Sequence, residues 1–420
     1  MRGILRSPDF RRLWLADGLS QVGNRIDFLV IPLLATTTLA ASVAEVSLLR
    51  TLSTLPYLLL GLQVGAWCDR MRNRPVLITA DLGRALLIGS VPLAAVFGSL
   101  TLGHLYVVVL LAGVFTVFFN VAHQTYLPNL VERGELPDAN ARLQTNLSVA
   151  AIAGPGLGGM IVQFIGGAGA MAVDALTYLW SAAWLHRIRT PDVRPEPAER
   201  NLRREIGEGL RTVMHNPLLR AIALHGAASS LFQSMFMAVS MVFMVRDLHV
   251  APFMIGLLGT ISLFGALLAS GVAQRLGTRF GAARALYFGA AVYSVSFLLN
   301  AFATQGWGLA WWVAGGFGSS FGIIVLGVFE TSFRQAVTPH ELLGRVSSVS
   351  QTVIFGIAPL GSLLGGLIAE LTTTRVTLYV CGIGILAASA ILIASPLRKM
   401  RDLPLAEGTV ENDQGDRERG

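Results

Sequence analysis

The chain has 420 residues, of which 53% are hydrophobic and only 14% are charged, and it carries a formal net charge of +7. Because soluble domains contain about 25% charged residues, this composition argues against a soluble protein and indicates an integral membrane protein. The basic residues lie in loops and at the ends of apolar segments, so we interpret the positive charge as a topology signal and not as a nucleic-acid-binding surface. The two cysteines, Cys68 and Cys381, offer neither a disulfide framework nor a metal-binding spacing.

Long apolar segments follow one another along the chain. A helix needs roughly 20 apolar residues to cross the hydrocarbon core of a bilayer, and twelve segments meet this requirement. We therefore predict an all-α membrane protein with 12 transmembrane helices and with both termini on the same side. The predicted spans are approximately residues 13–38, 44–66, 76–98, 104–126, 141–165, 168–187, 218–245, 252–274, 283–303, 307–333, 344–370 and 375–396.

Arginine is unevenly divided between the two sets of connecting loops. One set contains clusters such as Arg70, Arg72 and Arg74, whereas the opposite set contains only Arg246 and Arg375. Loops rich in Lys and Arg remain on the cytoplasmic side of a membrane. We therefore predict that both termini are cytoplasmic.

The longest connection, residues 188–217, divides the predicted spans six and six. Its first part is rich in proline and charge, as in a flexible linker. Residues 202–214 place apolar side chains on one helical face, which predicts an amphipathic helix on the membrane surface or on the cytoplasmic face of the protein. The predicted organisation is a six-helix bundle at 1–188, a cytoplasmic linker at 189–217, a second six-helix bundle at 218–398 and a disordered cytoplasmic tail at 399–420.

The two predicted bundles contain similar sequences. The connection into the fifth span reads VERGELPDANARL and the connection into the eleventh reads VTPHELLGRVSSV, and each has a Glu-Leu pair, at 135–136 and at 341–342. A proline follows in each span, Pro155 and Pro359, and then a Leu-Gly-Gly sequence. Two six-helix repeats around a site at the middle of the bilayer are typical of secondary transporters.

The turn between the second and third spans carries a recognisable pattern. Gly65 is followed by Asp69 and Arg70 and then by Arg72 and Arg74. This pattern resembles the signature of the major facilitator superfamily, and the resemblance extends over residues 8–398. It implies the fold of that superfamily, in which two six-helix bundles move against each other in the inner membrane of a bacterium.

A second motif resembles the one found in the fifth helix of antiporters in this superfamily. It consists of Gly154, Pro155, Gly158 and Gly159. The phrase LPNLVERGELPDANARL is most similar to the branch that contains enterobactin exporters and macrolide-efflux proteins. The resemblance implies a proton-coupled exporter of amphipathic small molecules that is embedded in the lipid bilayer, acts as a monomer, and needs no cofactor or nucleic acid.

The resemblance also implies a conformational latch at the turn. In this interpretation Gly65 lets the second helix approach the other bundle, and Asp69 forms charge-assisted hydrogen bonds there. The alternative is a solvated turn anchored by Arg70 and Arg74. Asp81 and Arg84 are three residues apart and can pair on one helical face, where Arg84 would support the latch.

Charged residues within the spans are the candidates for proton coupling, because a charge at that depth faces a cavity or a partner. Asp27 is the leading candidate, and a structural pair with an arginine is the alternative. Asp81 and Glu330 are further candidates, and Glu330 can pair with Arg334 as an intracellular gate. Asp174 is interpreted as peripheral and structural. The substrate-cavity candidates are Asn24, Arg25, Asn120, His123, Phe232, Gln233 and Phe236, and helix packing is the alternative for His123 and for the last three.

The leading function is export driven by a proton gradient. Uptake or facilitated diffusion of a nutrient is the alternative, and a receptor with a transporter fold is a remote one. We find no nucleophile-elbow or Walker sequence and no metal-spaced His and Cys residues, so the sequence predicts that the protein is not an enzyme.

Overall fold

The computed structural model describes residues 4–68, 70–190, 202–339 and 342–399. These residues form helices joined by short connections, and no strand occurs among them. The prediction of an all-α protein is therefore confirmed for this part of the chain. The α-helices are α1 Pro8–Thr37, α2 Val43–Cys68, α3 Asn73–Val96, α4 Leu102–Leu130, α5 Leu136–His186, α6 Leu202–His215, α7 Pro217–Val242, α8 Pro252–Phe280, α9 Ala282–Asn300, α10 Leu309–Val337, α11 Leu343–Leu371 and α12 Thr374–Ile393.

Short helical turns join or extend these helices. They are η1 Ile4–Arg6, η2 Arg133–Glu135, η4 Gly306–Gly308 and η6 Pro396–Lys399, with a π-helical turn, η3 Phe243–Asp247, at the end of α7. Asp69, residues 191–201 of the predicted linker and the predicted tail from residue 400 onward lie outside the described residues.

Ten stretches of the described chain are long and apolar enough to cross a membrane. One of them is the whole of α5, which has 51 residues and a non-helical backbone at Gly166, with φ of 74°. Only glycine adopts such a conformation readily. α1 is not among the ten, and it contains Arg25 and Asp27 in its middle.

The contacts of α5 with α1 show that the chain turns back at Gly166. Before it, Asn146 bonds to Trp14 and Gly154 packs on Arg25. Beyond it, Gly167 packs on Leu34, and the chain then returns along α1 until Arg189 bonds to Asp9. Thus α5 consists of two segments that run in opposite directions.

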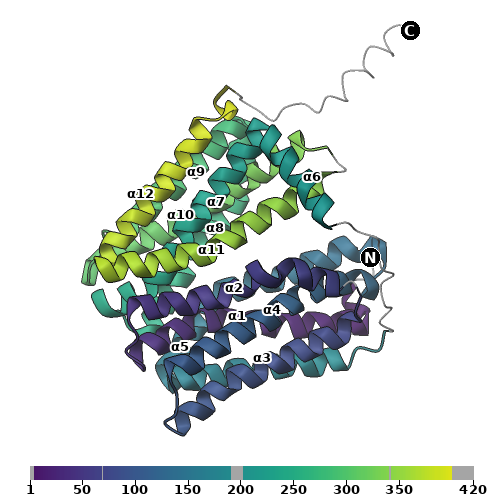
Figure 1. Cartoon of the computed structure of the whole chain (residues 1–420), viewed down its shortest axis with the longest axis vertical. Coiled ribbons are helices and arrows are strands. Elements are labelled where there is room, and N and C mark those ends of the chain that lie inside the picture. The colour runs from purple at the N-terminus through teal and green to yellow at the C-terminus, as the bar shows by residue number, and fades with distance from the viewer. Residues whose placement is uncertain (1–3, 69, 191–201, 340–341, 400–420) are drawn as a thin grey trace.

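The helices form two groups that lie side by side in Figure 1. The N-terminal group contains α1–α5, and the C-terminal group contains α7–α12. The main contacts between the groups are those of α2 with α11 and of α5 with α8. α6 packs on α11, where Gly209 touches the backbone of Arg345 and the Glu208 carboxylate pairs with the Arg345 guanidinium.

The closest contacts between the two groups occur at glycines, where no large side chain separates the helices. A side chain at Gly159 would collide with the carbonyl oxygen of Pro252, and one at Gly256 would collide with that of Pro155. Near the start of α2, Gly366 of α11 packs on Ser47 in a similar way. Glycine permits this backbone approach between membrane helices. We refer to the contact of Gly159 with Gly256 as the glycine crossing.

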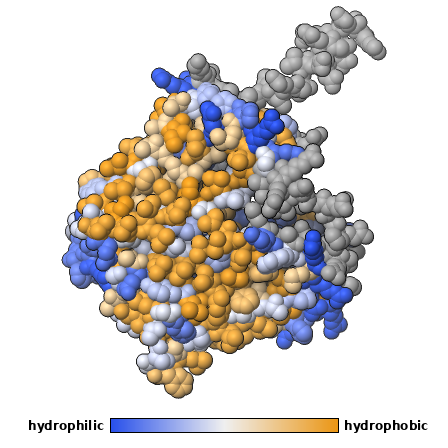
Figure 2. All heavy atoms as spheres, viewed as in Figure 1, coloured by the Kyte–Doolittle hydropathy of each residue, from blue (hydrophilic) through white to orange (hydrophobic). Residues whose placement is uncertain are grey.

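The outer surface of the helices is apolar. Figure 2 shows hydrophobic residues over most of the visible face of both groups, with hydrophilic residues gathered toward its edges. Large side chains such as Leu86, Phe164 and Leu371 are at least three-quarters exposed. Exposure on this scale suits a surface surrounded by lipid and not by water.

Candidate functional site

Two cavities adjoin each other: the first lies within the N-terminal group, and the second lies between the two groups. The N-side cavity, of about 350 Å³, is walled mainly by α1, α2 and α4. The C-side cavity, of about 360 Å³, is walled by α1, α5 and α7–α10. Arg25 and Phe28 of α1 line both cavities. The two together have the volume that small-molecule sites usually have.

The N-side cavity has a charged wall. Arg25, Asp27 and Arg50 line it, together with Asn24 and neutral polar side chains of α2 and α4. Arg50 was missed as a candidate, although it is a charged residue within the span predicted at 44–66. It lies 4.3 Å from the centroid of the Phe28 ring, which is a cation–π distance. Asn120 donates to the Tyr57 hydroxyl over 2.5 Å in the same wall.

The C-side cavity is lined mainly by aromatic and other apolar residues. Phe236, Tyr293, Phe297 and Trp312 form a continuous group of rings, with Phe236 4.9 Å from Phe297 and 5.7 Å from Trp312 between centroids. Gln233 lies in the same wall. Aromatic surfaces of this kind accept apolar ligands of varied shape.

Asp27 stands at the centre of a buried hydrogen-bond cluster. The Tyr178 hydroxyl lies 2.8 Å from Asn24 Oδ1 and 3.2 Å from Asp27 Oδ2. The carboxyl groups of Asp27 and Asp174 interact with each other, and one oxygen of each, Asp27 Oδ1 and Asp174 Oδ2, is buried without a donor among the described residues. One proton shared between the two carboxyl groups would satisfy this contact, because two adjacent carboxylates repel each other.

Asp174 was interpreted as peripheral, and the structure corrects this interpretation. It is fully buried against α1, where the absence of a side chain at Gly23 leaves room for its carboxyl group. The sequence signal was available, since Asp174 is an acid inside a span. The reversal of α5 at Gly166, which returns this segment toward Asp27, was needed to interpret it.

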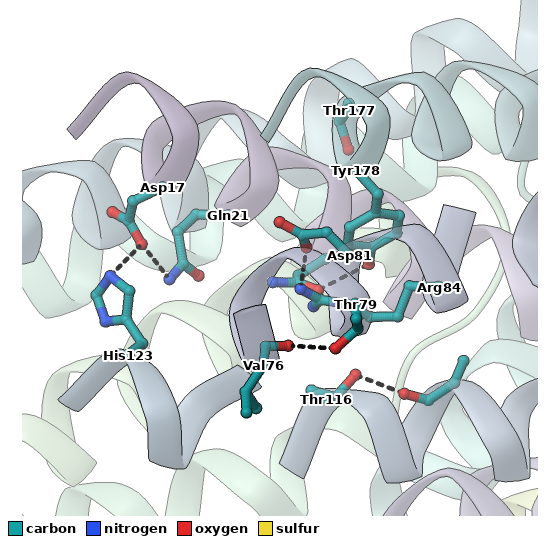
Figure 3. Close-up of polar contacts among 12 residues, drawn as sticks. Asp17, Gln21, Val76, Thr79, Asp81, Arg84, Thr116, His123, Thr177 and Tyr178 are labelled. Atoms are coloured by element: carbon teal, nitrogen blue, oxygen red, sulfur yellow. Dashed lines mark hydrogen bonds and ion pairs between the residues drawn. The ribbon is translucent and has the colours of Figure 1, made fainter. Parts of the chain in front are cut away.

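Asp81 and Arg84 of α3 form an ion pair inside the N-terminal group (Figure 3). The predicted pairing is therefore present, but Arg84 does not lie at the turn as a latch residue would. It is 1% exposed, and its guanidinium lies 4.3 Å from the Phe119 ring centroid and 4.4 Å from that of Tyr178. Asp81 lines neither cavity.

His123 is also removed from the two cavities, which corrects its assignment as a cavity residue. It stacks on Phe119, and its Nε2 atom lies 3.8 Å from Asp17 Oδ1 (Figure 3). Asp17 is 3% exposed and accepts hydrogen bonds from Gln21 Nε2 and Asn146 Nδ2. Asp17 was not identified from the sequence, because its partners come partly from distant parts of the chain.

In the C-terminal group, Glu330 pairs with His225 and not with Arg334. Glu330 Oε1 lies 2.7 Å from His225 Nδ1, and the Ser229 hydroxyl lies 3.1 Å from His225 Nε2. Arg334 instead donates to Thr331. The predicted gate pair is therefore not formed, because α7 supplies a closer partner. His225 was missed, as a lone histidine in an apolar helix gives no signal for its partner.

Other predicted residues lie at the following places. Phe232 packs against Gly384 of α12 and lines neither cavity, which corrects its assignment. Gly65 has open space around it, and Arg70 is exposed. Arg74 donates to the carbonyl oxygens of Leu185 and His186 at the end of α5. Both of these bonds stay within the N-terminal group, and Asp69 lies outside the described residues, so the latch remains a hypothesis.

The motif of the fifth span has two separate packing roles. Gly154 leaves room for the Arg25 stem, and Gly158 packs on Ile26 and Leu29 of the same helix. Pro155 and Gly159 face α8 at the glycine crossing. The motif thus fixes α1 within the N-terminal group and also forms the junction with the C-terminal group.

Comparison with known proteins matches residues 3–413 to the profile of the family described as transmembrane secretion effector. The chain is 26% identical to the multidrug efflux pump Tap of Mycolicibacterium fortuitum, with 87% of this chain and 90% of that protein covered. It is 22% identical to the macrolide efflux protein A of Streptococcus pyogenes, with 86% and 89% covered.

Solved structures share the fold. An inward-facing bacterial homologue of the iron transporter ferroportin superposes with a TM-score of 0.75 at 16% identity, over 94% of this chain and 99% of that one. The nucleoside transporter NupG gives a TM-score of 0.76 at 11% identity, over 93% and 99%. The chain is a transporter that spans the bacterial inner membrane several times, and it belongs to the transmembrane secretion effector family of the major facilitator superfamily.

Proposed function

We propose that the protein is a proton-coupled exporter of amphipathic small molecules. The efflux pumps among its relatives support the direction of transport. The carboxyl pair of Asp27 and Asp174 carries the proposal, because Asp27 also lines the N-side cavity. Asp27 would then interact with a substrate in the cavity and also belong to the pair that binds the proton. Binding of the substrate would therefore change the affinity of the pair for the proton.

The proposed cycle rests on alternating access. α1, the two segments of α5 and the remaining long helices other than α6 would give twelve spans in two six-helix bundles, 1–188 and 218–398, with both termini in the cytoplasm. With one shared proton the carboxyl pair carries a single negative charge; binding of a second proton removes this charge and favours the state in which the pair is buried, and release of that proton favours the other state. The turn at Gly65–Arg74 would close the cytoplasmic side once Asp69 reaches the other bundle, and one chain would suffice.

The proposal is tested in proteoliposomes with an imposed pH gradient. We expect wild-type protein to move a lipophilic drug from a panel of acidic, neutral and basic compounds against its gradient and to move protons in the opposite direction. Asp27→Asn should abolish gradient-driven transport, because an amide cannot bind and release a proton, and Asp174→Asn should weaken it strongly. Equilibrium exchange of the same drug should survive in both variants.

The matched control is Asp138→Asn, which changes a half-exposed aspartate at the start of α5. It should transport as the wild type does. If Asp27→Asn retains full gradient-driven transport, the carboxyl pair is not the coupling site. If no compound elicits proton movement while transport continues without a gradient, the proposed coupling is wrong.

A further inference from the structure

Arg25 and Arg50 are the most unusual groups in the cavity wall. Both lie within long helices, α1 and α2, and line the N-side cavity. Neither guanidinium forms an ion pair or a hydrogen bond with any residue that the structure describes. Among these residues, the Arg50 guanidinium contacts only the Phe28 ring. Charges in a membrane protein normally pair with a partner or face a path for a polar ligand.

The acid in the same wall does not neutralise them. Asp27 is two residues from Arg25, so the two side chains leave α1 in different directions. Its carboxyl group is occupied by Tyr178 and Asp174, which hold it toward the second segment of α5. Among the described residues, Asp27 is also the only acid that lines either of the two cavities. The N-side cavity therefore has an excess of positive charge.

The surroundings fix Arg25 in this position. Gly154 lets its stem pass between α1 and α5, since a side chain there would collide with Arg25 Cβ. Arg25 lines both cavities and so stands at the boundary between them. On one side lie Arg50 and the polar residues of α2 and α4. On the other lie the rings of Phe236 and Trp312.

We propose that the substrate is an anionic amphiphile, whose carboxylate, sulfonate or phosphate group is bound by Arg25 and Arg50 and whose apolar part lies against the rings of the C-side cavity. This inference rests on the proposed transport function and names its substrate class. Guanidinium groups suit such anions because they offer several donors in a plane and form bidentate hydrogen bonds.

The test compares two probes with the same apolar body. 8-Anilinonaphthalene-1-sulfonate carries a sulfonate, and N-phenyl-1-naphthylamine lacks it. Binding to the full-length protein in phosphatidylcholine nanodiscs is measured by fluorescence. We expect the sulfonate to bind more tightly, and we expect Arg25→Gln and Arg50→Gln each to weaken its binding about tenfold, the effect of one lost charge-assisted hydrogen bond. Binding of the neutral probe should change less than about twofold.

Three further variants serve as controls. Arg25→Lys and Arg50→Lys keep the charge and should retain part of the preference for the sulfonate, whereas Arg220→Gln removes an exposed arginine of α7 and should change neither probe. Equal losses for both probes, or a wild-type protein without preference for the sulfonate, would overturn the proposal. Neutral-probe binding shows that each variant is folded.

Anionic lipid headgroups carry the same kind of anionic group as a free amphiphile, so either could bind to Arg25 and Arg50. Nanodiscs with added phosphatidylglycerol distinguish the two sources: competition by the lipid assigns the site to a lipid anion, and its absence assigns it to a free amphiphile. The result is independent of proton coupling. Loss of sulfonate binding in the arginine variants, combined with unchanged gradient-driven transport by Asp27→Asn, would refute the coupling and leave this inference intact.

Discussion

The two helix groups place their charges differently. In the described part of the N-terminal group, the buried acids and arginine are Asp9, Asp17, Asp81, Arg84 and Asp174. In the described part of the C-terminal group no acid or arginine is buried, the one buried histidine is His225, and the cavity wall is dominated by aromatic rings. Groups with related sequences have thus diverged in chemistry. The difference suggests that the first group binds protons and charge, while the second accommodates the apolar body of the substrate.

The largest expected effect on stability comes from the buried charge of the N-terminal group. Arg84→Met should lower the free energy of unfolding by about 3–5 kcal/mol, because it leaves Asp81 buried without its counter-charge. Chemical denaturation in detergent measures this. The double variant Arg84→Met/Asp81→Asn should recover part of the loss. A single variant within about 0.5 kcal/mol of wild type would show that the buried charge is not a structural feature of this group.

An intermediate effect is expected in the rings of the C-terminal group. Phe236→Leu removes ring contacts with Phe297 and Trp312 and should cost about 1–2 kcal/mol of stability. It should also weaken binding of apolar probes. Phe264→Leu, at a half-exposed site on α8, is the matched control and should cost less than about 0.5 kcal/mol. Similar losses at both sites would contradict the distinct role of the ring cluster.

The smallest effect is expected for surface charge, where α6 packs on α11 of the C-terminal group. Glu208→Gln breaks the pair with Arg345, whose side chains are at least about one-third exposed. It should cost less than about 1 kcal/mol, because solvent already screens the pair, and the cost should shrink further in high salt. Thermal unfolding at two salt concentrations measures it. A loss as large as that of Arg84→Met would abolish the contrast between buried and surface charge.

Much of the fold followed from apolar length and loop composition. Eleven of the predicted spans correspond to segments of helices between α2 and α12, and the gap between the predicted spans 141–165 and 168–187 contains the turn at Gly166. The amphipathic helix predicted at 202–214 is α6. These features depend on local sequence, which a single chain provides.

The candidate site was harder to predict, because its pairings join distant segments. Asp27 was identified from its depth in the span, but its contact with Asp174 depends on the reversal of α5. Glu330 was assigned to Arg334, four residues along its own helix, whereas its partner is 105 residues away on α7. Local spacing predicts which side chains can share a face, but it does not identify the helix that packs against that face.

The glycine crossing has a mechanical consequence. Gly159 and Gly256 bring two backbones together with no side chains between them, so the groups can tilt about this point without exchanging rotamers. In the alternating access that we propose, the crossing would act as a fulcrum. Gly154, which gives Arg25 its passage, lies little more than one helical turn from it. Arg25 would therefore lie close to the axis of such a tilt, where displacement is smallest, while the helix ends would travel furthest. A bound anion would remain nearly stationary as the gates on either side of it open and close.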